Sequence, residues 1–164
     1  RHEEAVWLTK TKKYYFDLDS VRAQYSPEQK KLALKDKRLI PANIEKGKNP
    51  TNVWEIGRLN GNSKERVGHP TQKPVELIRR FVKSLSYEGS IVLDFFAGSG
   101  TTGRVCVEEN RHSIMVDSDK QMLEYFSQHI KNKNNSLLDK PFEQHVDKNL
   151  DEILDLIGQV NREK

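Results

Sequence analysis

The sequence has 164 residues, 35% of them hydrophobic, so it can bury one modest core but cannot hold two independent enzymatic domains. We find neither an apolar run of about 18 residues nor a secretory leader, and therefore expect no membrane span and a cytoplasmic location. The single cysteine, Cys106, excludes an internal disulfide and has no partner at metal-ligand spacing. We therefore interpret it as a small buried hydrophobe and expect no metal site.

The charge is distributed unevenly along the chain. Residues 1–80 hold 18 Lys and Arg against 10 Asp and Glu, a net charge of +8, whereas residues 81–164 hold 10 against 14, a net charge of −4. The basic half is the candidate surface for a polyanion such as DNA. A solvated lysine-rich loop that binds nothing would give the same charge pattern, so this alternative stays open.

The N-terminal half alternates between short apolar runs and polar loops. Residues 3–16 contain two apolar or aromatic runs around a polar turn, which predicts two strands or a hairpin, so we assign 1–16 to strands of a sheet. Residues 17–66 form a basic, loop-rich insertion that contains Pro27, Pro41, Gly47 and Pro50. Within this insertion we expect one short helix near 27–34 and a short strand at 53–56.

The second half is more regular. A helix is predicted to start at Pro74 and run to residue 85, followed by a buried strand at 91–95, a glycine turn, a helix at 101–109 and a second buried strand at 113–117. Ser118 is expected to cap a further helix with Met122, Leu123, Phe126 and Ile130 on its inner face. This order predicts a βαβ unit with parallel strands over residues 67–133. Residues 134–164 are predicted to form a C-terminal tail with one packing helix, whose apolar positions are Leu150, Ile153, Leu154, Ile157 and Val160.

The glycine turn and two acids suggest a nucleoside-containing ligand. Gly98 to Gly103 follow a strand and open a helix, where free N–H groups and the helix dipole attract a polar or anionic group. Asp117 ends the next strand, where a carboxylate can accept hydrogen bonds from the two hydroxyls of a ribose. The turn formally fits a dinucleotide fingerprint, but a carboxylate at Asp94 would repel a pyrophosphate and suits an amino group and a sulfonium. Asp94 therefore favours S-adenosylmethionine over NAD, although it could merely cap the turn, and Phe95 and Phe96 could be ordinary core.

The same residues resemble a known family. DFFAGSGTT at residues 94–102 is similar to the first motif of the DNA amino-methyltransferases, and HPTQKP at residues 69–74 resembles the segment that precedes it in their β-class arrangement. The similarity is strongest over about residues 49–130. It implies an α/β fold, Rossmann-like and typical of S-adenosylmethionine-dependent methyltransferases, incomplete in this chain and interrupted by the basic insertion. That arrangement places the target-recognition region before the cofactor motifs, which agrees with the position of the basic insertion before His69.

The resemblance also implies roles for individual residues. Asp94 would meet the methionine amino group, Asp117 would hold the ribose, and His69 is interpreted as structural. Lys73 would lie near the methionine carboxylate unless it is merely solvated. The cofactor-binding residues that we predict are Thr71, Gln72, Lys73, Asp94, Phe95, Phe96, Gly98, Ser99, Gly100, Thr101, Asp117 and Ser118. The residues that we predict to face DNA are Arg22, Lys30, Lys31, Lys35, Lys37, Arg38, Lys46, Lys48, Arg58, Lys64 and Arg66.

One departure from the family qualifies this prediction. The catalytic tetrapeptide of these enzymes contains Pro-Pro followed by an aromatic residue, and no Pro-Pro pair occurs in the 164 residues. We therefore predict no catalytic residue in this chain and expect it to be inactive alone, a missing N-terminal half or a complementary chain supplying the motif. The predicted function is a restriction-modification type DNA methyltransferase that acts on double-stranded DNA, with adenine N6 favoured over cytosine N4. A non-catalytic DNA-binding module, a nicotinamide-dependent oxidoreductase and a homodimeric assembly stay open as alternatives.

Overall fold

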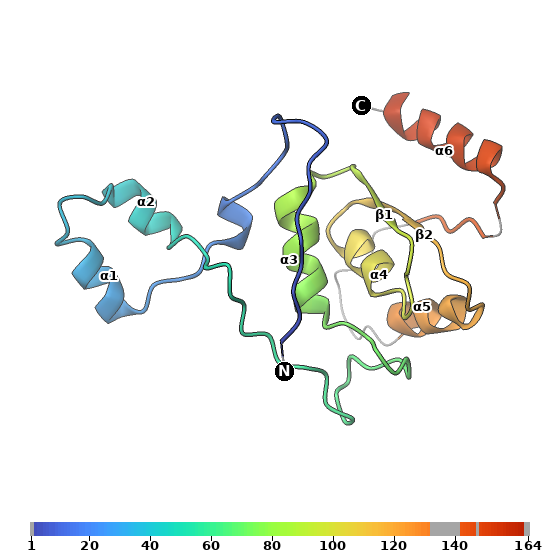
Figure 1. Cartoon of the computed structure of the whole chain (residues 1–164), viewed down its shortest axis with the longest axis horizontal. Coiled ribbons are helices and arrows are strands. Elements are labelled where there is room, and N and C mark those ends of the chain that lie inside the picture. The colour runs from blue at the N-terminus through green and yellow to red at the C-terminus, as the bar shows by residue number, and fades with distance from the viewer. Residues whose placement is uncertain (1, 132–141, 147, 163–164) are drawn as a thin grey trace.

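The computed structural model describes residues 2–131, 142–146 and 148–162 (Figure 1). Along the chain, helices come before, between and after the two strands of a short sheet. In space, the basic insertion projects away from this sheet. In chain order the elements are the 3-10 helix η1 (Asp19–Val21), α1 (Pro27–Ala33), α2 (Pro41–Lys46), α3 (Val75–Leu85), β1 (Ile91–Asp94), α4 (Thr101–Glu108), β2 (His112–Met115), α5 (Gln121–Lys131) and α6 (Leu150–Arg162).

The centre of the fold is the predicted βαβ unit. Strands β1 and β2 pair in parallel, with Ile91 opposite His112 and Asp94 opposite Met115, and α4 forms the connection between them. Helix α4 contacts α3, β2 and α5, so that α3, α4 and the sheet form adjacent layers (Figure 1). The α/β class, the parallel pairing and the element order of this region are confirmed. Because the strands are parallel, their carboxyl ends lie at the same edge of the sheet.

The core lies between α3 and α4. Val75 and Val82 from α3 meet Val105 and Cys106 from α4, and Val92 of β1 packs against this cluster. Val75, Ile78 and Val82 recur at helical spacing, which explains why one face of α3 is apolar. Cys106 is fully buried, and this burial raises the pKa of its thiol to about 12. The interpretation of Cys106 as a buried hydrophobe is confirmed.

One side of the sheet is open. Leu93 of β1 and Val116 after β2 are exposed, whereas the strand residues just before them are partly buried. Phe95 and Phe96 are 62% and 90% exposed, so the alternative that they belong to the core is wrong. A parallel sheet normally has both faces covered. The described residues therefore form part of a larger sheet architecture, as the prediction of an incomplete fold requires.

The N-terminal segment differs from the prediction. Residues 2–16 contain no strand; the segment folds back on itself at residues 10–12 and runs alongside α3 (Figure 1). It is held by ring contacts of Trp7 with Tyr14 (4.8 Å) and Phe16 (5.4 Å) and by a hydrogen bond from Asp17 N to Ser84 O (2.8 Å). The segment has the apolar runs of a strand, but no neighbouring strand in the described chain supplies the hydrogen bonds of a ladder.

The strand expected at residues 53–56 is also absent. The Trp54 side chain is used differently: its Nε1 donates to Thr51 O (2.9 Å), and its ring lies 5.0 Å from Phe81 and 4.3 Å from the Arg80 guanidinium. This segment thus fixes itself to α3 through one large side chain rather than through backbone pairing. The strand prediction is wrong for that reason.

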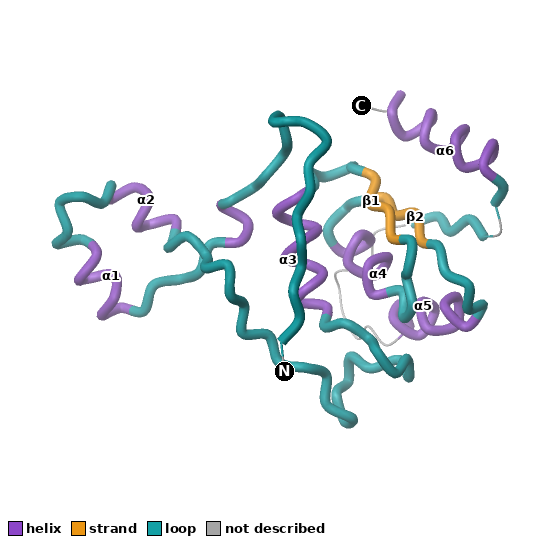
Figure 2. The backbone as a smooth tube through the Cα atoms, in the orientation of Figure 1, coloured by secondary structure: helices purple, strands orange, loops and turns teal. Residues whose placement is uncertain are grey.

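The basic insertion forms a small lobe, which we define as residues 17–49. Its first helix, α1, is confirmed, and Ser26 and Gln29 form a capping box at its start. Helix α2 was not predicted; Pro41 occupies its first turn, where a missing N–H costs little. The lobe leaves and rejoins the chain at an antiparallel bridge between Ala23 and Lys48, and Figure 2 shows it lying apart from the sheet.

The helices after β2 are largely as expected. Phe126 on α5 is buried, and Met122, Leu123 and Ile130 are partly buried, which confirms the predicted inner face. The cap is Asp119 rather than Ser118, since Asp119 Oδ1 accepts a hydrogen bond from Gln121 N (2.9 Å).

The C-terminal helix is present but does not pack as predicted. Figure 1 shows α6 apart from α3, α4 and α5, and its Leu154 is 54% exposed. The predicted boundary at 133/134 lies outside the described residues. No described helix has the length and apolar content that a membrane crossing requires.

Candidate cofactor site and nucleic-acid interface

The turn between β1 and α4 has two positions that strongly favour glycine. Gly98 and Gly100 have φ values of +51° and +75°, a region that disfavours residues with a Cβ atom. A Cβ at Gly100 would lie 2.9 Å from Phe126 Cβ, and one at Gly98 would lie 3.2 Å from the His69 ring. The turn is therefore pressed between α5 and the segment before α3. No side chain caps α4, so its first N–H groups are directed toward the turn.

Asp94 spans the turn from the end of β1. Its Oδ1 accepts a hydrogen bond from Phe96 N (3.0 Å), and its Oδ2 accepts one from Thr102 Oγ1 in α4 (2.6 Å). The carboxylate is partly buried and makes no ion pair among the described residues. Because a carboxylate offers about four acceptor positions, these two contacts leave capacity for a ligand.

Asp117 reaches the same turn from the end of β2. Its Oδ2 accepts a hydrogen bond from Gly98 N (2.7 Å), and its Oδ1 accepts one from Asp119 N (2.9 Å). These N–H groups, first Asp119 and then Gly98, hold the pKa of the Asp117 carboxyl below its ordinary value. The carboxylate is therefore ionised at neutral pH. Two acids from neighbouring strands thus converge on one bend of the backbone rather than pointing to opposite sides of the sheet.

The HPTQKP segment lies beside this turn. The His69 ring contacts Gly98 and meets the Tyr125 ring edge-on at 5.5 Å, and its Nδ1 accepts a hydrogen bond from Thr71 N (3.3 Å). Lys73 Nζ forms an ion pair with Glu3 (2.6 Å), and Lys73 O accepts from Thr101 Oγ1 (3.4 Å). The structure therefore brings Thr71 and Lys73 next to the turn, with the Lys73 ammonium already paired.

Gln72 has a different place from the one predicted. It is buried, its Oε1 accepts from Val67 N (2.9 Å) and its Nε2 donates to Glu65 O (2.8 Å). Its amide thus fixes the loop before α3, and both ends of the side chain are engaged within the protein. A direct contact between Gln72 and a ligand is not compatible with this arrangement.

The remaining predicted cofactor residues divide by exposure. The hydroxyls of Ser99 and Thr101 are buried and lie 2.8 Å from each other, so they face the protein interior. The side chains of Phe95, Phe96 and Ser118 are exposed at the rim of the turn. Among these five residues, the side chains of Phe95, Phe96 and Ser118 are therefore the ones accessible to a ligand.

Sequence reasoning missed His129. This α5 side chain is 1% exposed; its Nε2 lies 3.5 Å from Thr101 Oγ1 and its Nδ1 lies 3.4 Å from Arg104 Nη1. Burial, and then the Arg104 charge, lower the pKa of His129 to about 4. The signal that could have found it is helical spacing, since position 129 follows Phe126 by three residues on the same inner face.

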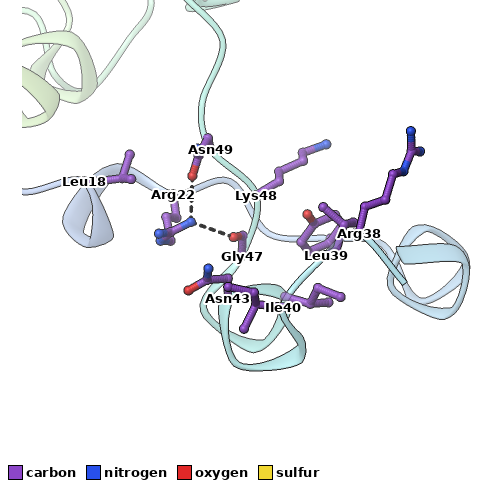
Figure 3. Close-up of a pocket in the computed structure, with 11 residues that line it drawn as sticks. Leu18, Arg22, Arg38, Leu39, Ile40, Asn43, Gly47, Lys48 and Asn49 are labelled. Carbon is purple, nitrogen blue, oxygen red and sulfur yellow. Dashed lines mark hydrogen bonds between the residues drawn. The ribbon is translucent and has the colours of Figure 1, made fainter. Parts of the chain in front are cut away.

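In the lobe, Arg22 is a structural residue. Its side chain is 10% exposed; Nη1 donates to Gly47 O (3.0 Å) and Asn49 Oδ1 (2.8 Å), as Figure 3 shows, and Nε donates to Asp19 Oδ1 (2.6 Å). These contacts close the neck of the lobe at the bridge between Ala23 and Lys48. The prediction that Arg22 faces DNA does not fit this geometry.

The other predicted basic residues are of two kinds. Some have acidic partners: Lys30 pairs with Glu45 (2.6 Å), Lys46 with Asp19 (2.7 Å) and Arg38 with Asp36 (2.8 Å). The side chains of Lys48 and Arg66 donate to neutral oxygens, Gln29 Oε1 (3.4 Å) and His69 O (3.3 Å). Within the described residues the structure shows no ion pair for Lys31, Lys35, Lys37, Arg58 and Lys64.

The lobe also contains a cavity of about 460 Å³ (Figure 3). Its wall mixes aliphatic and basic side chains, and Figure 3 shows Arg38 and Lys48 extending outward from it. The lining residues are Leu18, Arg22, Tyr25, Arg38, Leu39, Ile40, Asn43, Ile44, Gly47, Lys48 and Asn49. Among the described residues no group of three or more His, Cys, Asp or Glu side chains is placed to hold a metal ion.

The geometry thus defines an α/β protein whose glycine turn is bracketed by two strand-end acids and which carries a basic lobe. A family model described as DNA methylase, N6_N4_Mtase, matches residues 1–128, and the chain belongs to this family.

Individual relatives agree with this assignment. The chain is 39% identical over 125 residues to the type II methyltransferase M.HpaI of Haemophilus parainfluenzae, covering 76% of this chain and 36% of the relative. It is 32% identical over 123 residues to the DNA adenine methyltransferase YhdJ of Escherichia coli (strain K12), covering 74% and 42%. A solved structure, the PvuII DNA methyltransferase (cytosine-N4-specific), matches at 22% identity with a TM-score of 0.46, covering 68% of this chain and 38% of that one. The chain therefore spans less than half the length of these relatives.

Proposed function

We propose that this chain is the cofactor-binding and DNA-reading portion of an S-adenosylmethionine-dependent DNA amino-methyltransferase. The observation that carries the proposal is the convergence of Asp94 and Asp117 on one glycine turn in a chain of the DNA methylase family. Two carboxylates at this edge suit a ligand with a ribose and a cationic amino-acid portion, and they repel a pyrophosphate. This favours S-adenosylmethionine over a nicotinamide dinucleotide.

Each residue at the rim would have a defined part in holding this cofactor. Asp94 would accept from the methionine amino group with the acceptor positions that Phe96 N and Thr102 Oγ1 leave unused. Asp117, ionised at neutral pH, would accept from the ribose hydroxyls. Thr71 and Lys73 would lie near the methionine carboxylate, Lys73 exchanging its partner Glu3 for the ligand. Ser99 and Thr101 would support the turn from inside, and Gln72 would do so from the loop before α3.

When bound, S-adenosylmethionine supplies an electrophilic methyl group on a sulfonium. The amine nitrogen of a base would form the new N–CH3 bond as the S–CH3 bond breaks, leaving S-adenosylhomocysteine and releasing one proton from the amine. The base must leave the helical stack for its nitrogen to reach the methyl group in line. Phe95 and Phe96, exposed beside Asp94, would contact the cofactor or the extruded base.

The catalytic side of the reaction belongs to another part of the protein on this proposal. The sequence contains no Pro-Pro pair, and the chain spans 36% of M.HpaI and 42% of YhdJ. The remaining portion, whether on the same polypeptide or on a complementary chain, would cover the open face at Leu93 and Val116. We propose that the 164-residue chain alone does not transfer methyl groups.

Adenine N6 is the proposed target, since one relative at 32% identity is a DNA adenine methyltransferase. Mass spectrometry of nucleosides from DNA treated with the complete protein distinguishes the two products. N6-methyladenine is the expected product, and N4-methylcytosine alone would overturn this choice.

The lobe and the segment after it would bind double-stranded DNA. The side chains best placed for phosphate are Lys31, Lys35, Lys37, Arg58 and Lys64, which have no acidic partner among the described residues. Replacing Lys31, Lys35 and Lys37 by Gln should weaken binding to all sequences and lower the slope of log K against log salt by up to roughly 0.9 per lost phosphate contact. An unchanged slope would remove this surface from the proposal.

Calorimetric titration tests the cofactor directly. We expect binding of S-adenosylmethionine and none of NAD, and loss of binding in Asp94→Ala and in Asp117→Ala. Asp155→Ala, an exposed α6 carboxylate, is the matched control and should bind as the unsubstituted protein does. Binding of NAD would favour an oxidoreductase. DNA binding without S-adenosylmethionine affinity would favour a non-catalytic DNA-binding module.

A further inference from the structure

The buried imidazole of His129 connects α5 to the inner side of the glycine turn. It faces Thr101 Oγ1 at 3.5 Å through Nε2, and Thr101 Oγ1 in turn lies 2.8 Å from Ser99 Oγ and 3.4 Å from Lys73 O. Ser99, Thr101 and His129 are all less than 5% exposed, so these groups have little access to water. A buried polar group of this kind is costly unless its partners stay in place.

The neighbours of His129 fix its tautomer. On the other side of the ring, Nδ1 faces Arg104 Nη1 at 3.4 Å, and a guanidinium can only donate. Nδ1 must therefore accept, and the ring proton must be on Nε2, directed at Thr101 Oγ1. The Thr101 hydroxyl can then donate a hydrogen bond to Lys73 O.

Arg104 is itself held in place. Its Nε donates to Glu108 Oε1 (3.0 Å), and Glu108 also forms an ion pair with Arg79 of α3. The charged and titratable groups that the structure places around His129 are thus Arg104 and Glu108 of α4, with Arg79 behind them. A second cation on the ring beside Arg104 would be unfavourable, so the neutral form of His129 is the one that fits.

The position of α5 makes this contact relevant to the ligand side of the turn. Helix α5 begins just after Asp117 and packs Phe126 against Gly100, while His129 holds Thr101 one residue further along. The same helix thus contacts the turn at two successive residues, Gly100 and Thr101. A shift of Thr101 would move Gly98 to Gly100 relative to Asp117.

We propose that His129 is a positioning residue: its Nε2–H holds the Thr101 hydroxyl and thereby keeps the glycine turn in the geometry that binds the cofactor. This inference rests on the proposed function, in which the turn binds S-adenosylmethionine. It assigns His129 no contact with the cofactor or with the reacting atoms.

Three substitutions at one site separate this role from simple packing. His129→Gln keeps a donor near the Nε2 position, His129→Asn keeps a polar group on the Arg104 side only, and His129→Leu keeps neither. Cys106→Ala is the control, since Cys106 is equally buried on α4 but faces α3. The measurements, made in the complete protein, are S-adenosylmethionine affinity and the hydrogen exchange of the amides of residues 98–103 without cofactor.

We expect His129→Leu and His129→Asn to weaken cofactor affinity about fivefold to tenfold, as the loss of one buried hydrogen bond implies, and to speed exchange in the turn by a similar factor. His129→Gln should restore both to within about threefold. Cys106→Ala should lower thermal stability while leaving both quantities unchanged.

Several results would overturn the inference. They are turn amides in His129→Leu that exchange as in the unsubstituted protein, no difference between the Gln and Asn variants, or an equal effect of Cys106→Ala. If the unsubstituted protein binds no S-adenosylmethionine, the proposed function fails, but the exchange measurement still decides whether His129 holds the turn.

Discussion

The glycine-turn region and the basic lobe are built in opposite ways. In the turn region, α5 and the segment before α3 pack against one bend of the backbone, and the carboxylates of Asp94 and Asp117 accept hydrogen bonds from its N–H groups. In the lobe, α2 and the loops on either side of it line a cavity, and most of the charged side chains lie at the surface. On the proposed function, the first construction would suit a cofactor that is the same in every reaction cycle, and the second would suit DNA, whose sequence differs from site to site.

The largest expected effect tests the rigidity of the turn. Gly100→Ala should lower the free energy of unfolding by about 3 kcal/mol, because it combines a left-handed φ with a Cβ placed 2.9 Å from Phe126 Cβ. Urea denaturation measures this change. Gly61→Ala, where a Cβ would meet nothing within 4 Å, is the control and should change stability by less than about 0.5 kcal/mol. Equal effects of the two would mean that the turn is not tightly packed.

The next effect concerns pH. The pKa of His129 is about 4 in the folded protein against an ordinary value of 6.5. Between pH 4 and pH 6.5, His129 is therefore protonated in the unfolded chain and neutral in the folded one. Stability from this residue is therefore complete above about pH 7 and is lost as the pH falls. From pH 7 to pH 5 the loss is on the order of 2 kcal/mol.

The measurement is urea unfolding at both pH values, compared with the same pair for His129→Gln. The variant lacks this titration, so its loss of stability should be smaller by that amount. An identical loss in both proteins would show that the imidazole is solvated or already protonated in the folded state.

A smaller effect is expected at the neck of the lobe. Arg22→Ala removes three hydrogen bonds and should lower the free energy of opening of the lobe by about 1–2 kcal/mol, seen as faster hydrogen exchange at Ala23 and Lys48. Exchange in the glycine turn should stay the same. Arg38→Ala is the control, because its Asp36 partner is only two residues away and the pair is exposed at the arginine. Faster exchange in the turn as well would show that the two regions open together.

The smallest expected effect compares two lysines of the lobe. Lys37→Gln should reduce the salt slope of DNA binding by roughly 0.9 if Lys37 contacts one phosphate. Lys46→Gln should reduce it less, because Lys46 must first leave Asp19 at 2.7 Å to reach DNA. Filter binding or fluorescence anisotropy over a range of salt concentrations measures both. The reverse order would mean that the pairs seen without DNA do not persist at the interface.

The sequence predicted the βαβ unit well because its signals are local. The short apolar runs before Asp94 and Asp117, the glycines between them and the helical spacing from Val75 to Val82 are decided by residues near each other in the chain. The convergence of the two acids on the turn followed from parallel pairing alone. Which groups they bind there, Phe96 N and Gly98 N, depends on side-chain geometry that periodicity does not encode.

The failures have a common physical cause. Residues 3–16 and 53–56 have strand-like composition, but a strand needs a neighbour, and in the described chain Trp7 and Trp54 pack against nearby side chains. Arg22 and His129 depend on partners at least 25 residues away, at Gly47 and at Thr101 and Arg104, and Gln72 depends on the loop that brings Glu65 and Val67 back to it. A basic or polar residue type indicates what a side chain can do, and only its distant neighbours decide whether it faces a ligand or the interior.

The closure of the lobe at a single point has a consequence for how such a protein can change. The pairing of Ala23 with Lys48, the hydrogen bonds of Arg22 and the ion pair of Lys46 with Asp19 all lie where the two ends of the lobe meet, and Gly47 approaches Ala23 O closely at the same place. An insertion whose two ends are held side by side can be lengthened, shortened or replaced without disturbing the helices that follow it. On the proposed function, exchanging the segment between positions 23 and 48 for a foreign one would thus change the DNA sequence that is recognised and leave the glycine turn intact.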